Sequence, residues 1–227
     1  MATANGYKAM RSVPTALFHM MTDQKPSTAI TETIGVVLAG GKSSRMGRDK
    51  ATLELAGEPL LHRARNVLLA AGCSRVLLSG LPRPNWSDEA VPDLAPDSGP
   101  VGGIISALQS ASTTATEPLV LLFIPVDTPL LSPELLQDLT HEAYDKDGCA
   151  IADAPLPLAL RTTANVLEQC DATLQELIKG ESVSVRCFLN PLTLVHIPQS
   201  DAIKPLLINV NTPNEWESLN RELENCT

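Results

Sequence analysis

The sequence predicts an α/β fold, in which helices cover both faces of a mostly parallel sheet and form a three-layer α/β/α sandwich. Two observations carry this prediction. Short apolar segments that are typical of buried strands alternate along the chain with longer segments of helical periodicity. Several predicted strands are followed by glycine, aspartate or asparagine, as expected where the carboxyl ends of parallel strands form a ligand site.

The chain is predicted to hold one folded domain, residues 34–227. Residues 1–33 differ from the rest because they are rich in Met, Thr, Ala, Ser and Pro and lack a clear period, so a disordered N-terminal extension is expected there. A signal peptide is disfavoured because Pro14 and His19 interrupt the short apolar segment. No internal repeat or linker follows residue 33.

The first predicted strand, residues 34–39, is continuously apolar and is therefore expected to be buried on both faces. It ends at Gly40-Gly41, where the absence of Cβ atoms allows a sharp turn and a close approach to a ligand. A loop of this kind at the end of a strand favours an anion, above all a polyphosphate. Its cations and small polar residues are Lys42, Ser43, Ser44, Arg45, Gly47, Arg48 and Lys50.

Two familiar phosphate-binding loops do not fit this segment. The P-loop has a lysine directly after its last glycine, whereas here Arg48 follows Gly47 and the lysine is Lys50. The dinucleotide fingerprint needs Gly-x-Gly-x-x-Gly, and the adjacent glycines 40 and 41 lack that spacing. The segment therefore indicates a phosphate loop of another kind.

After this loop the sequence predicts a helix that Pro59 opens and Gly72 ends. A second strand follows over residues 75–79 and ends at Ser79. Residues 81–100 are irregular and rich in proline, and a loop of this length inside a domain is often functional.

That long loop contains Asp93 and leads into a cluster of glycines that includes Gly102. A helix is predicted over residues 101–111, beginning among these glycines. Its free N–H groups could bind a phosphate or a ring carbonyl. A glycine-rich connection that merely permits close packing remains an equally good interpretation of these residues by themselves.

The most apolar predicted strand, residues 119–124, is expected to be central in the sheet. Asp127 follows it directly. A carboxylate at this position is suited to hold Mg²⁺ on a nucleotide, because Mg²⁺ takes one or two carboxylates together with phosphate oxygens and water. Ser132 and Pro133 then predict the start of a helix that runs to about residue 144.

The remaining sequence continues the alternation. Residues 155–160 contain two prolines and are expected to form an edge segment, because proline cannot donate to a central ladder. Thr212 and Glu215 predict a capping box, which leaves Asn209 and Asn211 at the end of the preceding strand. The other predicted elements are a strand over 148–152, a helix over 163–179 hinged at Asp171, a shorter helix over 180–189, and strands over 193–197 and 206–210.

Composition limits the classes of partner. The net charge of −9 argues against general affinity for nucleic acid or an anionic membrane, although the local cations of residues 42–50 can still bind one small anion. No apolar run has the length needed to span a bilayer. Five cysteines without a Cys-x-x-Cys pair predict free thiols and a cytoplasmic protein.

Four segments together resemble one family, the molybdenum cofactor guanylyltransferases, over residues from about 34 to the C-terminus. The first and third segments are shared by the wider nucleotidyltransferase superfamily, and the Asn-x-Asn-Thr-Pro ending favours the molybdenum branch. The segments are Leu38-Ala39-Gly40-Gly41-Lys42-Ser43-Ser44-Arg45-Met46-Gly47-x-x-Lys50, Gly99-Pro100-Val101-Gly102-Gly103, Pro125-Val126-Asp127-Thr128-Pro129 and Ile208-Asn209-Val210-Asn211-Thr212-Pro213.

This resemblance implies a Rossmann-like sheet of the nucleotide-diphospho-sugar transferase type. It implies that GMP is transferred from GTP to the phosphate of molybdopterin or Mo-molybdopterin, with Mg²⁺ as cofactor and release of pyrophosphate. It also suggests a molybdenum-enzyme chaperone or another protein of cofactor biosynthesis as a partner. The implied catalytic residues are Arg45, Lys50 and Asp127, with Asp127 on the metal; the nucleotide would be bound by Leu38, Ala39, Gly40, Gly41, Lys50, Ser79, Asp93, Gly102 and Asp127, and the acceptor by Asn209 and Asn211.

The chain departs from the family at two positions. Ser79 stands where the family often has an asparagine against the base or ribose, and Ala154 precedes the 155–160 segment where the family tends to carry a polar residue. Two alternatives therefore stay open. One is cytidylyl transfer to molybdopterin or another small phosphate, because a glycine-rich loop does not dictate guanine. The other is a non-catalytic nucleotide-binding protein, which is disfavoured because Arg45, Lys50 and Asp127 are all present.

Overall fold

The computed structural model describes residues 32–39, 53–83, 86–113, 115–210 and 212–224. The extension predicted for residues 1–33 lies outside these ranges except for its last two residues. No helix within the described ranges combines the length and apolar character that a membrane span requires.

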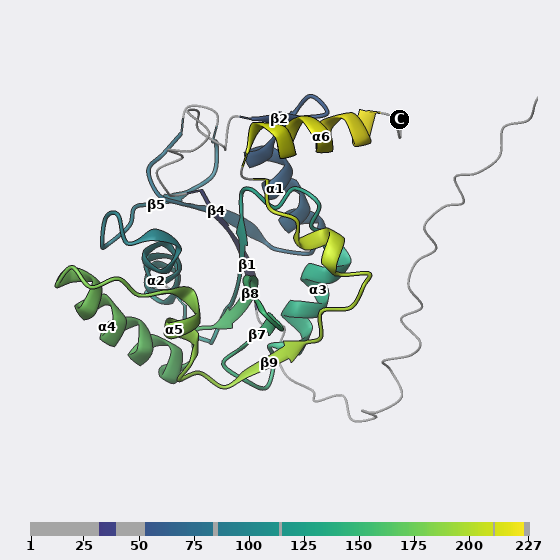
Figure 1. Ribbon diagram of the computed structural model, residues 1–227. Helices are drawn as coiled ribbons and strands as arrows, with labels where there is room; N and C mark the ends of the chain where they lie inside the picture. The colour runs from purple at the N-terminus through teal and green to yellow at the C-terminus, as the bar shows by residue number, and fades with distance from the viewer. Residues whose placement is uncertain (1–31, 40–52, 84–85, 114, 211, 225–227) are drawn as a thin grey trace, which may run out of the picture. The chain divides into compact units, whose positions relative to one another are not determined.

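The core of the structure is a seven-stranded sheet in the order β5-β4-β1-β6-β8-β7-β9. Among the seven described strands of this sheet, β8 alone runs antiparallel to its neighbours and the other pairs are parallel, so the predicted mostly parallel sheet is confirmed (Figure 1). The strands are β1 (Thr33–Leu38), β4 (Arg75–Ser79), β5 (Ala90–Val91), β6 (Val120–Pro125), β7 (Gly148–Ile151), β8 (Ala154–Arg161) and β9 (Leu194–Ile197).

The strand predicted to be central occupies the middle of this order. β6 lies between β1 and β8, and the side chains from Val120 to Ile124 are at most 1% exposed. The second predicted strand, residues 75–79, has the same bounds as β4. A separate hairpin joins β2 (Glu54–Leu55) to β3 (Glu58–Pro59).

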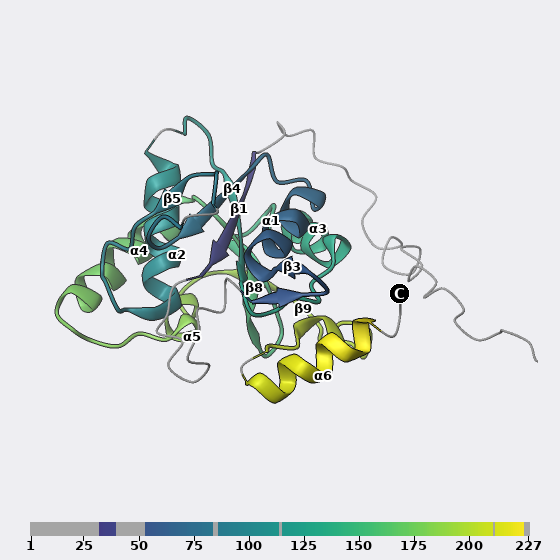
Figure 2. The same cartoon turned by 90° about the horizontal axis from the view of Figure 1, so that it is seen from above.

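Helices cover both faces of the sheet, as the three-layer prediction requires (Figures 1 and 2). One face carries α2 (Gly99–Ser112), α4 (Ala164–Ile178) and α5 (Val185–Leu189). The other face carries α1 (Leu60–Ala70) and α3 (Pro133–Glu142), and α6 (Pro213–Glu224) adds Leu219 to the same hydrophobic cluster.

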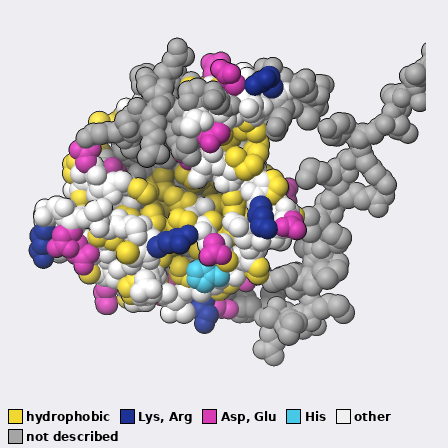
Figure 3. All heavy atoms as spheres, viewed as in Figure 1, with side chains coloured by type: hydrophobic (Ala, Val, Ile, Leu, Met, Phe, Trp, Pro, Cys, Tyr) yellow, Lys and Arg dark blue, Asp and Glu magenta, His cyan; other side chains and the backbone are white. Residues whose placement is uncertain are grey.

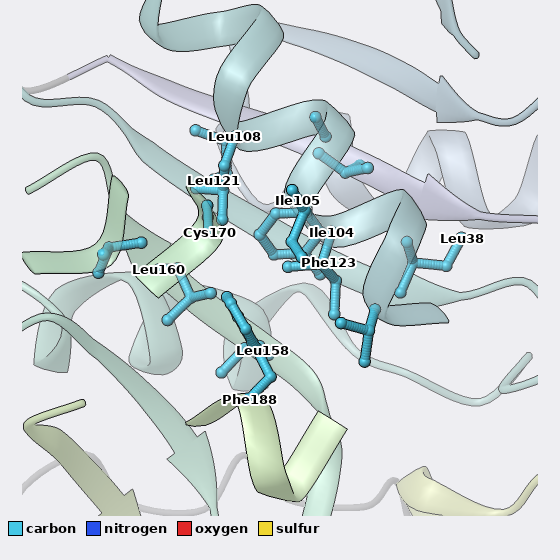
Figure 4. Packing of buried hydrophobic residues seen from close by; sticks show 14 of the residues in the cluster. Leu38, Ile104, Ile105, Leu108, Leu121, Phe123, Leu158, Leu160, Cys170 and Phe188 are labelled. Atoms are coloured by element: carbon cyan, nitrogen blue, oxygen red, sulfur yellow. The ribbon is translucent and has the colours of Figure 1, made fainter. Parts of the chain in front are cut away.

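The first of these faces is packed with aliphatic side chains around two aromatic rings. Figure 4 shows Ile104 and Ile105 of α2 against Phe123 of β6, with Phe188 of α5 beside Leu158 of β8. Both rings are fully buried. A core of this kind fixes the spacing between helices and sheet, and thereby the positions of the loops at the strand ends.

Two predicted helix starts are confirmed by their capping geometry. The Ser132 hydroxyl accepts a hydrogen bond from the N–H of Leu135 at 3.3 Å. Thr212 and Glu215 form the predicted capping box: the Thr212 N–H donates to Glu215 Oε2 at 3.0 Å, and the Glu215 N–H donates to Thr212 Oγ1 at 3.3 Å.

The prediction of an edge segment over residues 155–160 is wrong. β8 lies inside the sheet, between β6 and β7. Its prolines are tolerated because Leu158–Arg161 form the ladder with β6, while Pro155 and Pro157 fall before that ladder. In the ladder between β8 and β7, a register shift between Ala150 and Ile151 leaves Pro155 and Pro157 without a paired residue in β7.

Three further predictions are corrected by the structure. α4 is continuous and has no hinge at Asp171, whose carboxylate instead accepts a hydrogen bond from Gln109 of α2 at 2.7 Å. The short helix begins at Val185 rather than at residue 180, because Ser184 caps it by accepting from the Cys187 N–H. Residues 206–210 form no strand; the 3₁₀ helix η3 (Lys204–Leu207) includes Pro205, which lacks the N–H that a ladder needs.

Candidate active site

The candidate site lies at the carboxyl edge of the sheet, where β1, β4 and β6 end together. Leu38, the last residue of β1, is in register with Ser79 of β4 on one side and with Pro125 of β6 on the other. The Val126 N–H donates to the Leu38 carbonyl at 3.3 Å. The structure thus brings Leu38, Ala39 and Ser79 close to the segment that carries Asp127.

On the β4 side of β1, Ser79 and Asp93 form a polar pair. The Ser79 hydroxyl, on a side chain that is 3% exposed, lies 3.5 Å from Asp93 Oδ1. Burial raises the pKa of the Asp93 carboxyl, while the hydrogen bond from Ser79 opposes that shift. The pair therefore presents an acceptor and a hydroxyl in a partly desolvated place, which suits recognition of a base or ribose.

The amino end of α2 packs against this pair without side-chain atoms. A Cβ on Gly103 would lie 2.1 Å from Ser79 Oγ and 3.3 Å from Leu38 Cδ2. Gly103 is therefore required for this close approach, and the sequence showed it only as one member of the glycine cluster. Gly102 has a different packing reason, since its Cβ would lie 2.0 Å from Ser98 Oγ. Its contact with a nucleotide stays a prediction.

Arg83 also lies in this region, although no motif of the sequence indicated it. Its Nη2 donates to the carbonyl of Ala39 at 2.8 Å, and burial lowers the pKa of its guanidinium. The contact ties the loop after β4 to the end of β1, at the residue just before the predicted phosphate loop. Arg83 belongs to the proline-rich segment that was expected to be functional, but no spacing pattern distinguishes it there.

On the β6 side of β1, the carboxyl-terminal segment returns to the end of the strand. The Val210 N–H donates to the carbonyl of Asp127 at 2.9 Å, and Thr128 Oγ1 donates to Asn209 Oδ1 at 2.7 Å. Asn209 thus lies beside the Asp127 segment, as predicted, although no strand precedes it. The two contacts fix a carboxylate and an amide on adjacent segments.

A carboxylate at the position of Asp127 could hold a magnesium ion that is shared with a substrate. Its side chain is partly exposed at the sheet edge. Among the described residues no group of three or more His, Cys, Asp or Glu side chains could hold a metal by itself. A single carboxylate is nevertheless sufficient for Mg²⁺ when phosphate oxygens and water complete the shell.

Five predicted site residues lie outside the described residues, so their roles stay predictions: Gly40, Gly41, Arg45, Lys50 and Asn211. The described chain that resumes at residue 53 is held in place by two hydrogen bonds. The Leu60 N–H donates to the Leu53 carbonyl at 2.8 Å, and the Ala56 N–H donates to Asn220 Oδ1 of α6 at 2.9 Å.

Comparison with known proteins supports a nucleotide-transfer site. The model of the MobA-like NTP transferase domain matches residues 35–189. The molybdenum cofactor guanylyltransferase of Xanthomonas euvesicatoria pv. vesicatoria (strain 85-10) is 38% identical over 207 residues, which are 89% of this chain and 98% of the relative.

Two solved structures show the same fold at low sequence identity. Molybdopterin-guanine dinucleotide biosynthesis protein A from Archaeoglobus fulgidus has a TM-score of 0.65 and 20% identity, covering 85% of this chain and 99% of that one. The 2-C-methyl-D-erythritol 4-phosphate cytidylyltransferase from Thermus thermophilus has a TM-score of 0.58 and 13% identity, covering 83% of this chain and 98% of that one.

The fold, the family model and the curated relative together define this protein as a nucleotidyltransferase. The family model covers more than half of the chain, and the curated relative is matched over almost its full length. The chain therefore belongs to the MobA-like NTP transferase family.

Proposed function

We propose that this nucleotidyltransferase transfers GMP from GTP to the terminal phosphate of molybdopterin or Mo-molybdopterin, and so acts in molybdenum cofactor biosynthesis. One observation carries the proposal: the register of the sheet holds the end of β1 between Ser79 with Asp93 on one side and Asp127 on the other. A base-reading site and a phosphate site would thus flank one loop. The choice of guanine follows the name of the curated relative, a molybdenum cofactor guanylyltransferase. The choice of molybdopterin follows the motif resemblance described above and the name of the Archaeoglobus fulgidus protein of the same fold.

The reaction requires positioning and charge neutralisation rather than an activated side chain. An oxygen of the acceptor phosphate attacks the α-phosphorus of GTP, and the bond from that phosphorus to the bridging oxygen breaks. Pyrophosphate leaves with the electron pair, and a new phosphoanhydride joins GMP to the acceptor. Because the nucleophile is already an anion, no serine, cysteine or general base is needed.

Asp127 is the proposed carboxylate ligand of Mg²⁺, which supplies charge neutralisation and orientation at the phosphates when it is bound. Lys50 and Arg45 are proposed to add positive charge around the same phosphates. Asn209 and Asn211 are assigned to the acceptor, and Asn209 is already held beside the Asp127 segment through Thr128.

Asp93 is proposed to select guanine. Guanine presents two adjacent donors, its ring N–H and its amino group, and a carboxylate can accept both with its two oxygens. Cytosine presents one amino donor beside acceptors, so the same carboxylate would be matched less well. Ser79 and Gly103 would fix the position of Asp93 relative to the end of β1.

The test is pyrophosphate release in the presence of Mg²⁺ and Mo-molybdopterin, with GTP, CTP, ATP and UTP compared. We expect GTP to exceed the other nucleotides by at least about tenfold in kcat/KM. A preference for CTP would keep the transfer and overturn the choice of base, which is a relevant outcome because a cytidylyltransferase shares the fold. Binding without release for every nucleotide would overturn the transfer itself.

A further inference from the structure

A cavity of about 310 Å³ lies beside β9 and at the carboxyl end of β7, away from the Ser79–Asp93 pair. Because β7 and β9 run parallel to β6, the cavity opens at the same edge of the sheet as Asp127. Figure 3 shows hydrophobic side chains gathered in the middle of this view, with basic, acidic and histidine side chains at their border. None of the residues assigned above to the nucleotide lines this cavity.

The cavity exists because the chain turns tightly here and carries small side chains. Asp153 has a φ of +62° in the turn between β7 and β8, and the ladder shifts register between Ala150 and Ile151. Ala150 and Ala154 leave space on one wall. α5 spans five residues and closes the opposite side.

The polar side chains of the cavity have unused hydrogen-bonding capacity. Arg186 Nη2 donates to the Asp153 carbonyl at 2.7 Å, and its other N–H groups have no partner among the described residues. The side chains of Asp153, Asn190 and His196 likewise have no hydrogen-bond partner within the described ranges. A guanidinium, an amide, an imidazole and a carboxylate thus face one space, whose remaining walls are aliphatic.

We propose that this cavity binds the ring system of the acceptor, a pterin or a similar flat nitrogen heterocycle with an amide-type edge. This inference rests on the proposed function. Aliphatic walls such as Leu189 and Pro155 would pack against the faces of the ring, as in most small-molecule sites. Arg186 and Asn190 would donate to the ring carbonyl, and Asp153 would accept from its N–H and amino groups.

The position of the cavity agrees with the length of such an acceptor. β8 separates β7 from β6, so the end of β7 lies two strand spacings, about 10 Å, from the end of β6. A ring at β7 could therefore carry its phosphate towards Asp127. The nucleotide would approach from β4 and β1, on the other side of β6, so the two anions would meet at Asp127 from opposite halves of the edge.

The cavity is tested by the binding of 6-hydroxymethylpterin, a phosphate-free probe, followed through its fluorescence on the full-length protein. Ala154→Phe fills the cavity, and Arg186→Leu removes the fixed donor from an exposed position. We expect each change to weaken probe binding by about tenfold or more. The control is Arg75→Leu, because Arg75 is the first residue of β4 and therefore lies at the amino ends of the parallel strands, away from the cavity.

The control variant should bind the probe within about twofold of the wild type, and all variants should keep their affinity for GTP within about twofold. A wild-type protein that does not bind the probe, or variants that bind it equally well, would overturn the proposal. Arg186→Leu keeps the test valid if Ala154→Phe fails to fold.

Failure of this proposal can be separated from failure of the proposed function. In the pyrophosphate assay Arg186→Leu should raise the KM for Mo-molybdopterin about tenfold and leave the KM for GTP unchanged. Turnover with an unchanged acceptor KM would overturn the cavity and leave the transfer standing. Probe binding that the variants abolish, in a protein that releases no pyrophosphate, would overturn the transfer and leave the cavity standing.

Discussion

The two halves of the sheet are built differently. In the half formed by β5, β4, β1 and β6, all strands are parallel and the ends of β1, β4 and β6 are held in register. In the half formed by β8, β7 and β9, β8 runs antiparallel to its neighbours, and the β7–β8 ladder shifts register between Ala150 and Ile151. The first half gathers polar groups within hydrogen-bonding distance of one another, whereas the second leaves an open cavity.

This difference shows how the order of a sheet sets the kind of site at its edge. The segments that follow parallel strands begin at the same edge of the sheet and therefore lie close together. Close contacts such as that of Gly103 with Ser79 then determine how the polar groups of the site are placed. A reversed strand with a shifted register does not align its turn with its neighbours. The space that remains suits a larger ring rather than a set of phosphates.

The largest effect is expected at Asp127, which follows β6, the strand that borders the second half of the sheet. We expect Asp127→Ala to lower kcat by about a thousandfold, equivalent to about 4 kcal/mol, because it removes the proposed metal ligand. Pyrophosphate release with GTP measures the effect. Asp201→Ala is the control, since that carboxylate is 97% exposed and pairs with Lys204. Activity that survives Asp127→Ala would remove this residue from the reaction.

The mixed half is expected to be the more sensitive to an added methyl group. A Cβ on Gly148 of β7 would lie 2.2 Å from the Ala159 carbonyl oxygen of β8, so backbone would have to move. We expect Gly148→Ala to reduce the free energy of unfolding in urea by about 3 kcal/mol. Gly35→Ala in β1 should cost about 1 to 2 kcal/mol, because its nearest contact, at 2.9 Å, is a Leu68 side-chain atom. Equal costs would contradict this contrast between the halves.

Substitutions at the amino ends of the strands, opposite the candidate site, should change the stability of the fold and leave nucleotide binding unchanged. Asp147 precedes β7 and accepts hydrogen bonds from the Thr193 N–H, the Thr163 hydroxyl and the Asn165 amide. Burial by itself would raise the pKa of Asp147, but these three hydrogen bonds and the positive charge of Arg161 together outweigh it and leave the pKa lowered. The carboxylate therefore stabilises the fold above its unfolded pKa of about 3.9, and this contribution is lost as the pH falls through the lower folded pKa.

Asp147→Asn should accordingly reduce the free energy of unfolding by about 2 kcal/mol at neutral pH and flatten its decline in acid. Urea unfolding at a series of pH values from about 6 to about 2 measures both effects. Asp145→Asn changes an exposed carboxylate two residues earlier and should stay within about 0.5 kcal/mol of the wild type. An unchanged slope in acid for Asp147→Asn would contradict the role of Asp147.

The smallest expected effect is on GTP binding, and it concerns only the half of the sheet formed by β5, β4, β1 and β6. Gly103→Ala should displace the Ser79 hydroxyl and weaken GTP binding by about tenfold, or about 1.4 kcal/mol, while pterin binding at the other half stays unchanged. Titration calorimetry with GTP and Mg²⁺ measures the loss. Gly103→Ala should also lower the free energy of unfolding. The double variant Ser79→Ala with Gly103→Ala should regain part of that loss, because the Ser79 hydroxyl that the new methyl group would meet is absent. Wild-type affinity in Gly103→Ala would show that the Ser79 pair does not contact the nucleotide.

Much of the fold could be predicted because its signals are local. β4 has the predicted bounds, β6 is central as its apolar sequence indicated, and the cap of Ser132 and the box of Thr212 with Glu215 are confirmed. Each of these depends on residues within a few positions of one another. The polar residues at the ends of parallel strands could be predicted in the same way, since parallel strands share one carboxyl edge.

The sequence by itself determined the alternation of strands and helices, the helix caps and the family, because these follow from short-range periodicity and spacing. Only the tertiary structure decided that β8 lies inside the sheet, that Arg83 binds the Ala39 carbonyl, and that a cavity forms around Arg186. These features join segments that are distant in the chain. Their free energy depends on how strands pair and pack, which the local pattern of residues does not contain.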